Sequence, residues 1–264
     1  MIETITSPQN ERIKRLLALE QKSSERRAQG LFVVEGRREL QRCIDAGYKV
    51  KTVFRQPQLA PEPLPRIDGA EEVCVSERVY GRIAMRASTE GIVAIVEARR
   101  LSLNQLTLSP QPLLVVLESV EKPGNLGAVL RSADAAAADA VVVCDPLTDL
   151  YNPNLIRNSV GTAFTVPCVA CTSSECIDFL TARNIQILTA QLQDSRLYYD
   201  TDMRRATAIV FGTESTGLTE QWRKAATAHI RIPMLGRADS LNVSVSAAVL
   251  LFEAVRQRRT DAAP

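Results

Sequence analysis

One pattern, an apolar run beside small and polar residues, recurs in Ile209-Val-Phe-Gly-Thr-Glu-Ser-Thr-Gly-Leu218, Ile230-Arg-Ile-Pro-Met-Leu-Gly236 and Ser240-Leu-Asn-Val-Ser-Val-Ser-Ala-Ala-Val-Leu-Leu-Phe-Glu253. In the first two segments the apolar run comes first, which is typical of a strand that ends in a loop. The third segment begins as a loop and continues into a run with the length of a buried helix. We therefore expect three loops that line one pocket.

The composition indicates a soluble globular protein. The chain has 264 residues, of which 45% are hydrophobic and 23% are charged, and this length is sufficient for one large domain or two small ones. No apolar run approaches the roughly 20 residues that cross a bilayer. Because the first residues lack the charged and then apolar order of a secretory signal, we expect a cytoplasmic protein without a membrane partner.

The cysteines and the single histidine restrict the possible chemistry. The cysteines are Cys43, Cys74, Cys144, Cys168, Cys171 and Cys176. The first three lie in apolar runs, where a thiol behaves as a small hydrophobic group. Cys168 and Cys171 have the spacing of a zinc or redox pair, but the chain has no second pair of this kind. A Ser-His-Asp or Cys-His site would have to use His229, so we expect no such site and no metal.

Positive charge is concentrated in the first fifth of the chain. Residues 1–55 contain twelve Lys or Arg and seven Asp or Glu, a difference of +5, whereas the whole chain carries +2 and the remainder therefore −3. A solvated helical surface explains this pattern, and so does a surface that binds nucleic acid. The candidate nucleic-acid-binding residues are Arg12, Lys14, Arg15, Arg26, Arg27, Arg37 and Arg38.

The pattern of elements predicts a small α/β domain over residues 1–97. Strands are expected at 31–34, 50–54, 73–75 and 91–96, with helices at 8–20, 37–46 and 76–85. Ser7 is expected to cap the first helix, with Pro8 at its first position. The charged segment 22–29 is expected to be exposed. Residues 98–111 mix charged and polar residues with proline, which is typical of a linker between domains.

Residues 112–264 predict a second α/β domain with a parallel sheet. The expected strands are 113–117, 140–144, 164–166, 185–189, 208–211 and 230–232, and the expected helices are 125–137, 153–160, 173–183, 219–226 and 243–257. Continuous Val, Ile and Leu runs that alternate with helices indicate parallel strands covered on both faces. Ligands of such sheets bind in loops at the carboxyl ends of the strands. These loops are 118–125, 212–218 and 233–242.

The first of these loops contains a glycine-rich helix start. Gly124 and Gly127 surround Asn125, which is suited to cap the helix. The segment lacks both the G-x-G-x-x-G spacing of a dinucleotide site and the Lys-Ser/Thr pair of a P-loop. Arg131 follows Asn125 by six residues. It is interpreted either as a clamp for a phosphate or substrate, or as an exposed helical arginine.

Three motifs in this order resemble the signature motifs of the SpoU/TrmH family, within the SPOUT superfamily. They are Pro123-Gly-Asn-Leu-Gly-Ala-Val-Leu-Arg-Ser-Ala-Asp134, Phe211-Gly-Thr-Glu-Ser-Thr-Gly-Leu218 and Ile232-Pro-Met-Leu-Gly-Arg-Ala-Asp-Ser-Leu-Asn-Val-Ser-Val-Ser-Ala-Ala248. The resemblance implies an S-adenosylmethionine-dependent RNA ribose 2'-O-methyltransferase that forms a homodimer. It also implies a deep trefoil knot in the second domain, whereas residues 1–97 resemble a ribosomal-protein-like domain that binds the RNA substrate.

The resemblance also assigns site residues. It implies that the cofactor lies in the knot and is held mainly by backbone groups of Gly212, Ile232 and Leu241, with Thr189, Gly217, Met234, Gly236, Asn242 and Ser246 nearby. The implied catalytic residues are Arg131, Asn125 and Glu214. Because a guanidinium is a poor general base that stays charged in proteins, we expect Arg131 to orient the 2'-hydroxyl and stabilise the developing alkoxide. Asn125 would position the substrate, and Glu214 would organise Asn125 or interact with a helix dipole.

The substrate implied by the resemblance is structured RNA, with ribosomal RNA favoured and transfer RNA as the alternative. A catalytically idle RNA-binding module is a second class of function, and the presence of Asn125, Arg131, Glu214 and Asn242 argues against it. A nucleotide-dependent oxidoreductase would need the glycine fingerprint that the chain lacks. Glu121-Lys122-Pro123 departs from the Asp-Pro step common in the family, which affects the expected substrate more than the expected reaction.

Overall fold

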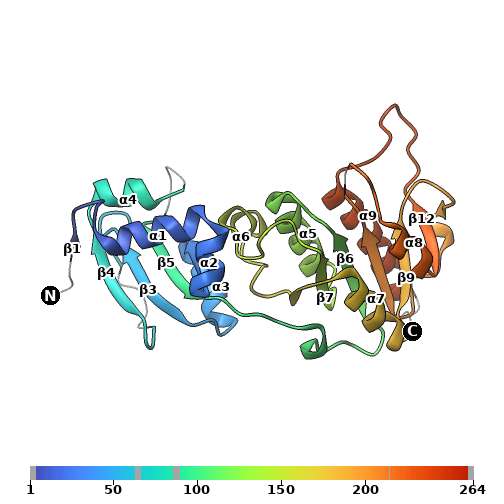
Figure 1. Ribbon diagram of the computed structural model, residues 1–264, viewed down its shortest axis with the longest axis horizontal. Helices are drawn as coiled ribbons and strands as arrows, with labels where there is room; N and C mark the ends of the chain where they lie inside the picture. The colour runs from blue at the N-terminus through green and yellow to red at the C-terminus, as the bar shows by residue number, and fades with distance from the viewer. Residues whose placement is uncertain (1–3, 63–66, 86–89, 214, 261–264) are drawn as a thin grey trace. The chain divides into compact units, whose positions relative to one another are not determined.

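The computed structural model describes residues 4–62, 67–85, 90–213 and 215–260 (Figure 1). The chain forms two compact units. The first contains Met1–Arg99 and Tyr151–Thr165, and the second contains Arg100–Leu150 and Val166–Pro264. The segment Tyr151–Thr165 thus packs within the first unit, although its place in the sequence is inside the second predicted domain.

The first unit has a mixed sheet of five strands. They are β1 (Thr4–Ile5), β2 (Leu31–Glu35), β3 (Val50–Arg55), β4 (Glu71–Val75) and β5 (Ile92–Glu97), in the order β1-β4-β3-β5-β2. β5 is antiparallel to both β2 and β3, and the other two pairs are parallel. The four predicted strands are confirmed, and β1 is an addition that its two residues gave no pattern to predict.

The helices of this unit correct two predictions. They are α1 (Glu11–Gln21), α2 (Ser23–Gln29), α3 (Arg37–Asp45), α4 (Glu77–Ile83) and α6 (Pro153–Ser159). The first helix begins after Asn10 instead of Ser7, because the Asn10 side chain accepts a hydrogen bond from the Arg12 N–H at 2.9 Å. The segment expected to be exposed and charged forms α2, which ends at Gly30 in the left-handed conformation with φ of 64°.

The second unit has a fully parallel sheet, as predicted, but with seven strands instead of the six expected. They are β6 (Leu113–Glu118), β7 (Ala140–Cys144), β8 (Cys168–Cys171), β9 (Gln186–Ala190), β10 (Arg196–Leu197), β11 (Thr207–Phe211) and β12 (Ala228–Arg231), in the order β10-β12-β9-β11-β6-β7-β8. Every residue of β6, β7 and β11 is buried, so both faces of the central sheet are covered.

One predicted strand of this sheet was wrong. Residues 164–166 form a turn, and the edge strand is β8 instead. The reason is that the Phe164 ring stacks on Phe32 of β2 with centroids 5.9 Å apart, which places this segment in the core of the first unit. Cys168 and Cys171 therefore lie within a strand and not at its exit.

The helices of the second unit pack on this sheet. They are α5 (Pro123–Ala135), α7 (Ser173–Ala182), α8 (Glu220–Ala225) and α9 (Val243–Thr260), with two 3-10 turns at Leu103–Gln105 and Tyr198–Asp200. α7 and α8 share a buried cluster with strands β6, β7 and β11, while α5 and α9 pack against each other. α5 begins after Lys122 with Pro123 at its first position, so Asn125 lies in the first turn and is not the predicted cap. None of the helices in the described part of the chain has the length and apolar character of a membrane span.

Candidate functional site

A cavity of about 250 Å³ lies at the carboxyl ends of the neighbouring strands β6 and β11. Its walls come from the loop after β6, the first turn of α5, the loop after β11 and the start of α9; Asn125, Gly212, Thr213 and Val243 are among the lining residues. Two of the three loops that the sequence predicts to share a pocket therefore do so. The third loop contributes to this wall only through Val243, where it enters α9.

The loop after β11 is a tight turn that requires glycine. Thr213 and Gly217 exchange two backbone hydrogen bonds, of 3.2 and 3.1 Å, and Gly217 has φ of 69°. A Cβ atom at Gly212 would overlap the backbone of Gly217 and Leu218. The turn thus brings the backbone of Gly212 to the cavity wall. Glu214, predicted to be catalytic, lies outside the described residues.

Asn125 and Asn242 join two segments that are 117 residues apart. The Asn242 Nδ2 donates a hydrogen bond of 3.2 Å to the Asn125 Oδ1. The Asn242 Oδ1 accepts bonds from the backbone N–H and the hydroxyl of Ser244, at 3.0 and 2.7 Å, and its carbonyl accepts from Val245 and Ser246. Asn242 therefore caps α9 and, through the same side chain, holds the first turn of α5 beside the cavity.

A buried carboxylate, Glu118, connects the cavity wall to the loop after β11. It is 3% exposed, and it accepts hydrogen bonds from the Thr219 backbone N–H at 2.9 Å and from the Thr219 hydroxyl at 2.6 Å. The Ser173 hydroxyl lies 3.4 Å from the same carboxylate and 2.6 Å from Asp145, and it accepts a bond from the Trp222 indole N–H at 3.0 Å. The sequence prediction missed Glu118, although an acidic residue that ends an apolar strand was a usable signal.

The remaining predicted cofactor residues lie apart from this cavity wall. Thr189 is fully buried in β9, and its hydroxyl is hydrogen-bonded to the His229 Nδ1 at 2.6 Å. The segment 232–242 leads from β12 to α9 as an irregular loop that is exposed at residues 236–242 (Figure 1). Besides Asn242, it carries four predicted cofactor residues: Ile232, Met234, Gly236 and Leu241. Ser246 is half-buried in the first turn of α9.

The backbone is accessible at two glycines. An added Cβ at Gly217 or Gly236 would meet no atom within 4 Å. Leu235 and Leu241, on the same loop as Gly236, are 96% and 36% exposed. Main-chain groups at Gly217 and Gly236 are therefore accessible to a ligand.

Comparisons with known proteins decide the family. Residues 112–252 match the SpoU rRNA Methylase family, and residues 10–94 match the MRM3-like substrate binding domain. The chain belongs to the SpoU family. A relative from Streptomyces viridochromogenes, named 23S rRNA (uridine(2479)-2'-O)-methyltransferase, is 30% identical over 96% of this chain and 92% of its own length.

Solved structures of the family have the same fold. An AdoMet-bound rRNA methyltransferase from Sinorhizobium meliloti has a TM-score of 0.88 and 29% identity, covering 97% of this chain and 98% of its own. The SpoU methyltransferase AviRb from Streptomyces viridochromogenes in complex with AdoMet has a TM-score of 0.86 and 28% identity, covering 96% of this chain and 99% of its own. These matches confirm the α/β fold with a parallel sheet and the resemblance on which the site residues were assigned.

The arginine of the first SpoU motif occupies an exposed position. Arg131 lies on α5 six residues after Asn125, which corresponds to nearly two helical turns. Of the predicted catalytic and cofactor residues that the structure describes, Asn125 and Gly212 line the cavity. Arg131 is therefore on the helix that forms part of the wall, but its guanidinium is accessible from solvent.

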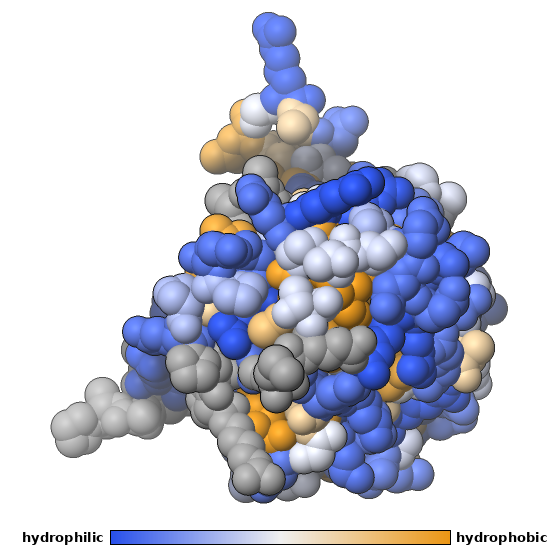
Figure 2. All heavy atoms as spheres, turned by 90° about the vertical axis from the view of Figure 1, so that its left-hand side faces the viewer, coloured by the Kyte–Doolittle hydropathy of each residue, from blue (hydrophilic) through white to orange (hydrophobic). Residues whose placement is uncertain are grey.

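The predicted RNA-binding residues differ in their environments. Three are paired with acidic neighbours: Arg12 with Glu71 at 2.9 Å, Lys14 with Glu11 at 2.7 Å and Arg38 with Glu39 at 3.0 Å. Arg15 donates to Gln29 at 2.7 Å, and Arg27 is exposed on α2. Figure 2 shows one face of the first unit, where hydrophilic residues predominate.

Arg26 corrects the prediction of an exposed phosphate contact. Its side chain is 4% exposed and donates to the carbonyl oxygens of Leu19 and Glu20, at 2.5 and 3.0 Å. These carbonyls belong to the last turn of α1, where a helix leaves its carbonyl oxygens without intrahelical donors. Arg26 therefore stabilises the junction of α1 and α2 and does not face a substrate.

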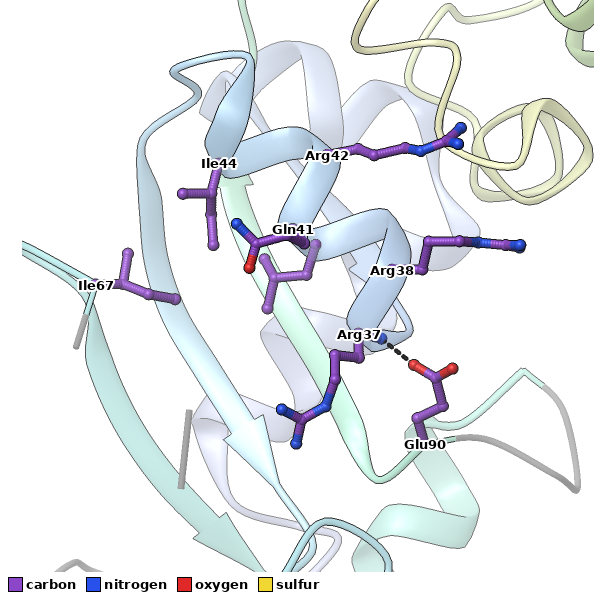
Figure 3. Close-up of a pocket in the computed structure, with 8 residues that line it drawn as sticks. Arg37, Arg38, Gln41, Arg42, Ile44, Ile67 and Glu90 are labelled. Atoms are coloured by element: carbon purple, nitrogen blue, oxygen red, sulfur yellow. Dashed lines mark hydrogen bonds between the residues drawn. The ribbon is translucent and has the colours of Figure 1, made fainter. Parts of the chain in front are cut away.

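A second cavity, of about 410 Å³, lies beside α3 in the first unit (Figure 3). Arg37, Arg38 and Arg42 line it, and the backbone N–H of Arg37 donates to the Glu90 carboxylate. Figure 3 shows Arg38 and Arg42 extending to the same side of α3, while Arg37 points elsewhere. The Arg42 guanidinium is engaged with the carbonyl of Val160 at 2.7 Å.

Proposed function

We propose that this chain transfers a methyl group from S-adenosylmethionine to a ribose 2'-hydroxyl of ribosomal RNA. The observation that carries the proposal is the Asn125–Asn242 hydrogen bond beside the cavity, because it joins the first and third SpoU motifs. The substrate is supported by the relatives, since the Streptomyces protein is named for a uridine of 23S rRNA and a Bacillus subtilis relative for a guanosine of 23S rRNA. Transfer RNA is the alternative substrate.

S-adenosylmethionine supplies, when bound, a methyl group activated on a sulfonium. The residues that would hold it are Gly212, Ile232 and Leu241, with Thr189, Gly217, Met234, Gly236, Asn242 and Ser246 nearby. Support for this assignment comes from the open backbone at Gly217 and Gly236 and from the close approach that only glycine permits at position 212. The two AdoMet-bound structures of the family support the cofactor itself.

The side chains of the first motif would act on the RNA. In our proposal, Arg131 donates hydrogen bonds to the ribose 2'-hydroxyl and stabilises the negative charge that develops on its oxygen. A guanidinium stays charged and does not accept the proton, which passes to a substrate phosphate or to water. Asn125 positions the substrate, and Glu214 organises Asn125 and the loop after β11. In-line placement of the hydroxyl is the main contribution expected of these residues.

The first unit would bind RNA phosphates. We propose that the exposed cations on α1 and α2, above all Lys14, Arg15 and Arg27, neutralise phosphates and so position the substrate. Arg12, Arg37 and Arg38 would add to this surface. Such contacts carry no sequence information themselves, but they determine which nucleotide reaches the second unit.

We further propose a trefoil knot, a homodimer and a cytoplasmic location. The knot is supported by the membership of this chain in the SpoU family, through the resemblance of its three motifs. The dimer is supported by Val245 and Phe252, two apolar residues seven positions apart on α9 that are 47% and 49% exposed. Sedimentation of the Phe252→Glu variant as a dimer would contradict this interface.

Calorimetry with S-adenosylmethionine tests the proposed function. Binding of one cofactor per chain is expected, with affinity reduced at least ten-fold in Asn242→Ala, because this change removes both the cap of α9 and the contact to Asn125. Asn104→Ala, a change at an exposed asparagine outside these motifs, is the control. The absence of binding would favour a catalytically idle RNA-binding module.

A further inference from the structure

Three cysteines from separate elements of the second unit converge. Cys144 ends β7, Cys171 ends β8, and Cys176 lies in the first turns of α7. The three Sγ atoms lie within 4.8 Å of one another. Cys144 and Cys171 are paired residues of the β7–β8 ladder, and Cys176 reaches them from the helix that packs on β7. The cluster is not the Cys168–Cys171 pair that the sequence spacing suggested.

The geometry suits a thiophilic cation. Three thiolates that bind one Zn²⁺ at about 2.3 Å in tetrahedral geometry have sulfur atoms about 3.8 Å apart. The observed limit of 4.8 Å therefore requires each sulfur to move by less than about 1 Å. Cys144 and Cys176 are fully buried and Cys171 is half-buried, so the cluster is enclosed except on the side of Cys171.

Neighbouring groups hold the sulfurs in place. The first turn of α7 is fixed by a reciprocal cap in which Thr172 and Glu175 each bond the other's backbone N–H. Asp145, which follows Cys144, accepts hydrogen bonds from the backbone N–H and hydroxyl of Ser173 at 3.1 and 2.6 Å. The ladder and the cap thus order the cluster before any ion binds, and pre-ordered ligands bind more tightly.

The charges around the cluster also favour a cation. Asp145 and Glu175 are the carboxylates that act on Cys171. These two negative charges near Cys171 favour a cation at the cluster.

We propose that Cys144, Cys171 and Cys176 bind one Zn²⁺ ion through three thiolates, with water as the fourth ligand. The ion links β7, β8 and α7 and stabilises the second unit, because a ligand that binds only the folded state raises its stability. It takes no part in methyl transfer. The site is therefore independent of the proposed function.

Metal titration of the full chain tests this site. The reduced, metal-free protein is titrated with Zn²⁺ in competition with a chromogenic chelator, and with Co²⁺ for its thiolate charge-transfer absorption. One ion per chain is expected, with affinity at least ten-fold weaker in Cys171→Ala. Cys168→Ala is the matched control, because Cys168 lies three residues earlier on β8 and points to the opposite face. It is expected to bind like the wild type.

Folding of each variant is followed through Trp222, which is fully buried in the same unit. Zn²⁺ is expected to raise the melting temperature of the wild type and of Cys168→Ala but not of Cys171→Ala. No uptake of Zn²⁺ by the folded wild type, or equal affinity in Cys171→Ala, overturns the proposal. Recovery of a disulfide between two of the three cysteines from reduced cell extract, in place of metal, overturns it as well.

Discussion

Removing the Glu118 carboxylate is expected to loosen the loop after β11. In Glu118→Ala, the backbone N–H and hydroxyl of Thr219 lose acceptors at 2.9 and 2.6 Å, and the Ser173 hydroxyl loses one at 3.4 Å. Hydrogen bonds to a charged group contribute about 1.5–3 kcal/mol each, so two good bonds amount to about 3–6 kcal/mol. The burial cost of the carboxylate is relieved in the variant, which leaves a net loss of about 2–4 kcal/mol.

Glu118→Gln is expected to lose less, about 1–2 kcal/mol. The glutamine carbonyl can still accept from the Thr219 N–H, while its amide group can donate to a hydroxyl that rotates to accept. Thr219 precedes α8 and follows the turn of residues 212–217, so we also expect weaker S-adenosylmethionine binding in both variants. The alanine variant should lose affinity by at least ten-fold.

Urea unfolding followed by tryptophan fluorescence measures the effect on stability. The chain contains a single tryptophan, Trp222, whose indole N–H donates to Ser173, so its emission reports on the second unit. Glu121→Gln, a change at an exposed acidic residue of the loop after β6, serves as control and is expected to alter stability by less than about 0.5 kcal/mol. Unfolding of Glu118→Ala at the wild-type urea concentration would refute the reasoning.

Other perturbations give distinct expectations. Burial, followed by the charge of Glu35, raises the pKa of Glu20 from 4.5 to about 8, so the folded state retains a proton there that the unfolded state releases, and stability falls as pH rises through this window. Glu20→Gln should remove that decline between pH 5 and 9 in circular-dichroism melts; an unchanged decline would contradict it. Gly212→Ala should destabilise the second unit by about 1–3 kcal/mol in urea unfolding, whereas Gly236→Ala should be neutral. Arg27→Glu should weaken binding to rRNA and lower the slope of log affinity against log salt concentration by about one unit. An equal slope in the variant and the wild type would mean that Arg27 belongs to a solvated surface that does not bind RNA.

The sheet of the second unit was predictable because its strands carry their own signal. Runs such as 113–117 and 140–144 are apolar without alternation, which indicates strands buried on both faces and hence a parallel sheet. Parallel strands then place their following loops at one edge. The shared cavity of the loops after β6 and β11 follows from these two steps.

The features that sequence reasoning missed depend on partners far along the chain. Glu118 ends an apolar strand and reads as the start of a loop, but its burial depends on Thr219, 101 residues later. The segment 164–166 has the composition of a strand, yet Phe164 packs against Phe32. Arg26 belongs to a charged run and is nevertheless buried against the end of α1.

Sequence reasoning missed the cysteine cluster for the same reason. Spacing drew attention to Cys168 and Cys171, which a strand directs to opposite faces. The sulfurs that meet come instead from two strands and a helix, and this convergence depends on the register of β7 against β8.

Transfer of labelled methyl groups to ribosomal RNA tests the central claim most directly. The purified chain is incubated with methyl-labelled S-adenosylmethionine and unmodified rRNA, and the RNA is digested to nucleosides. Label is expected in one 2'-O-methyl nucleoside. It should be abolished in Arg131→Ala with cofactor binding retained, and unaffected in Arg183→Ala, a change at an exposed arginine after α7. Label on a base, no label at all, or normal methylation by Arg131→Ala would contradict it.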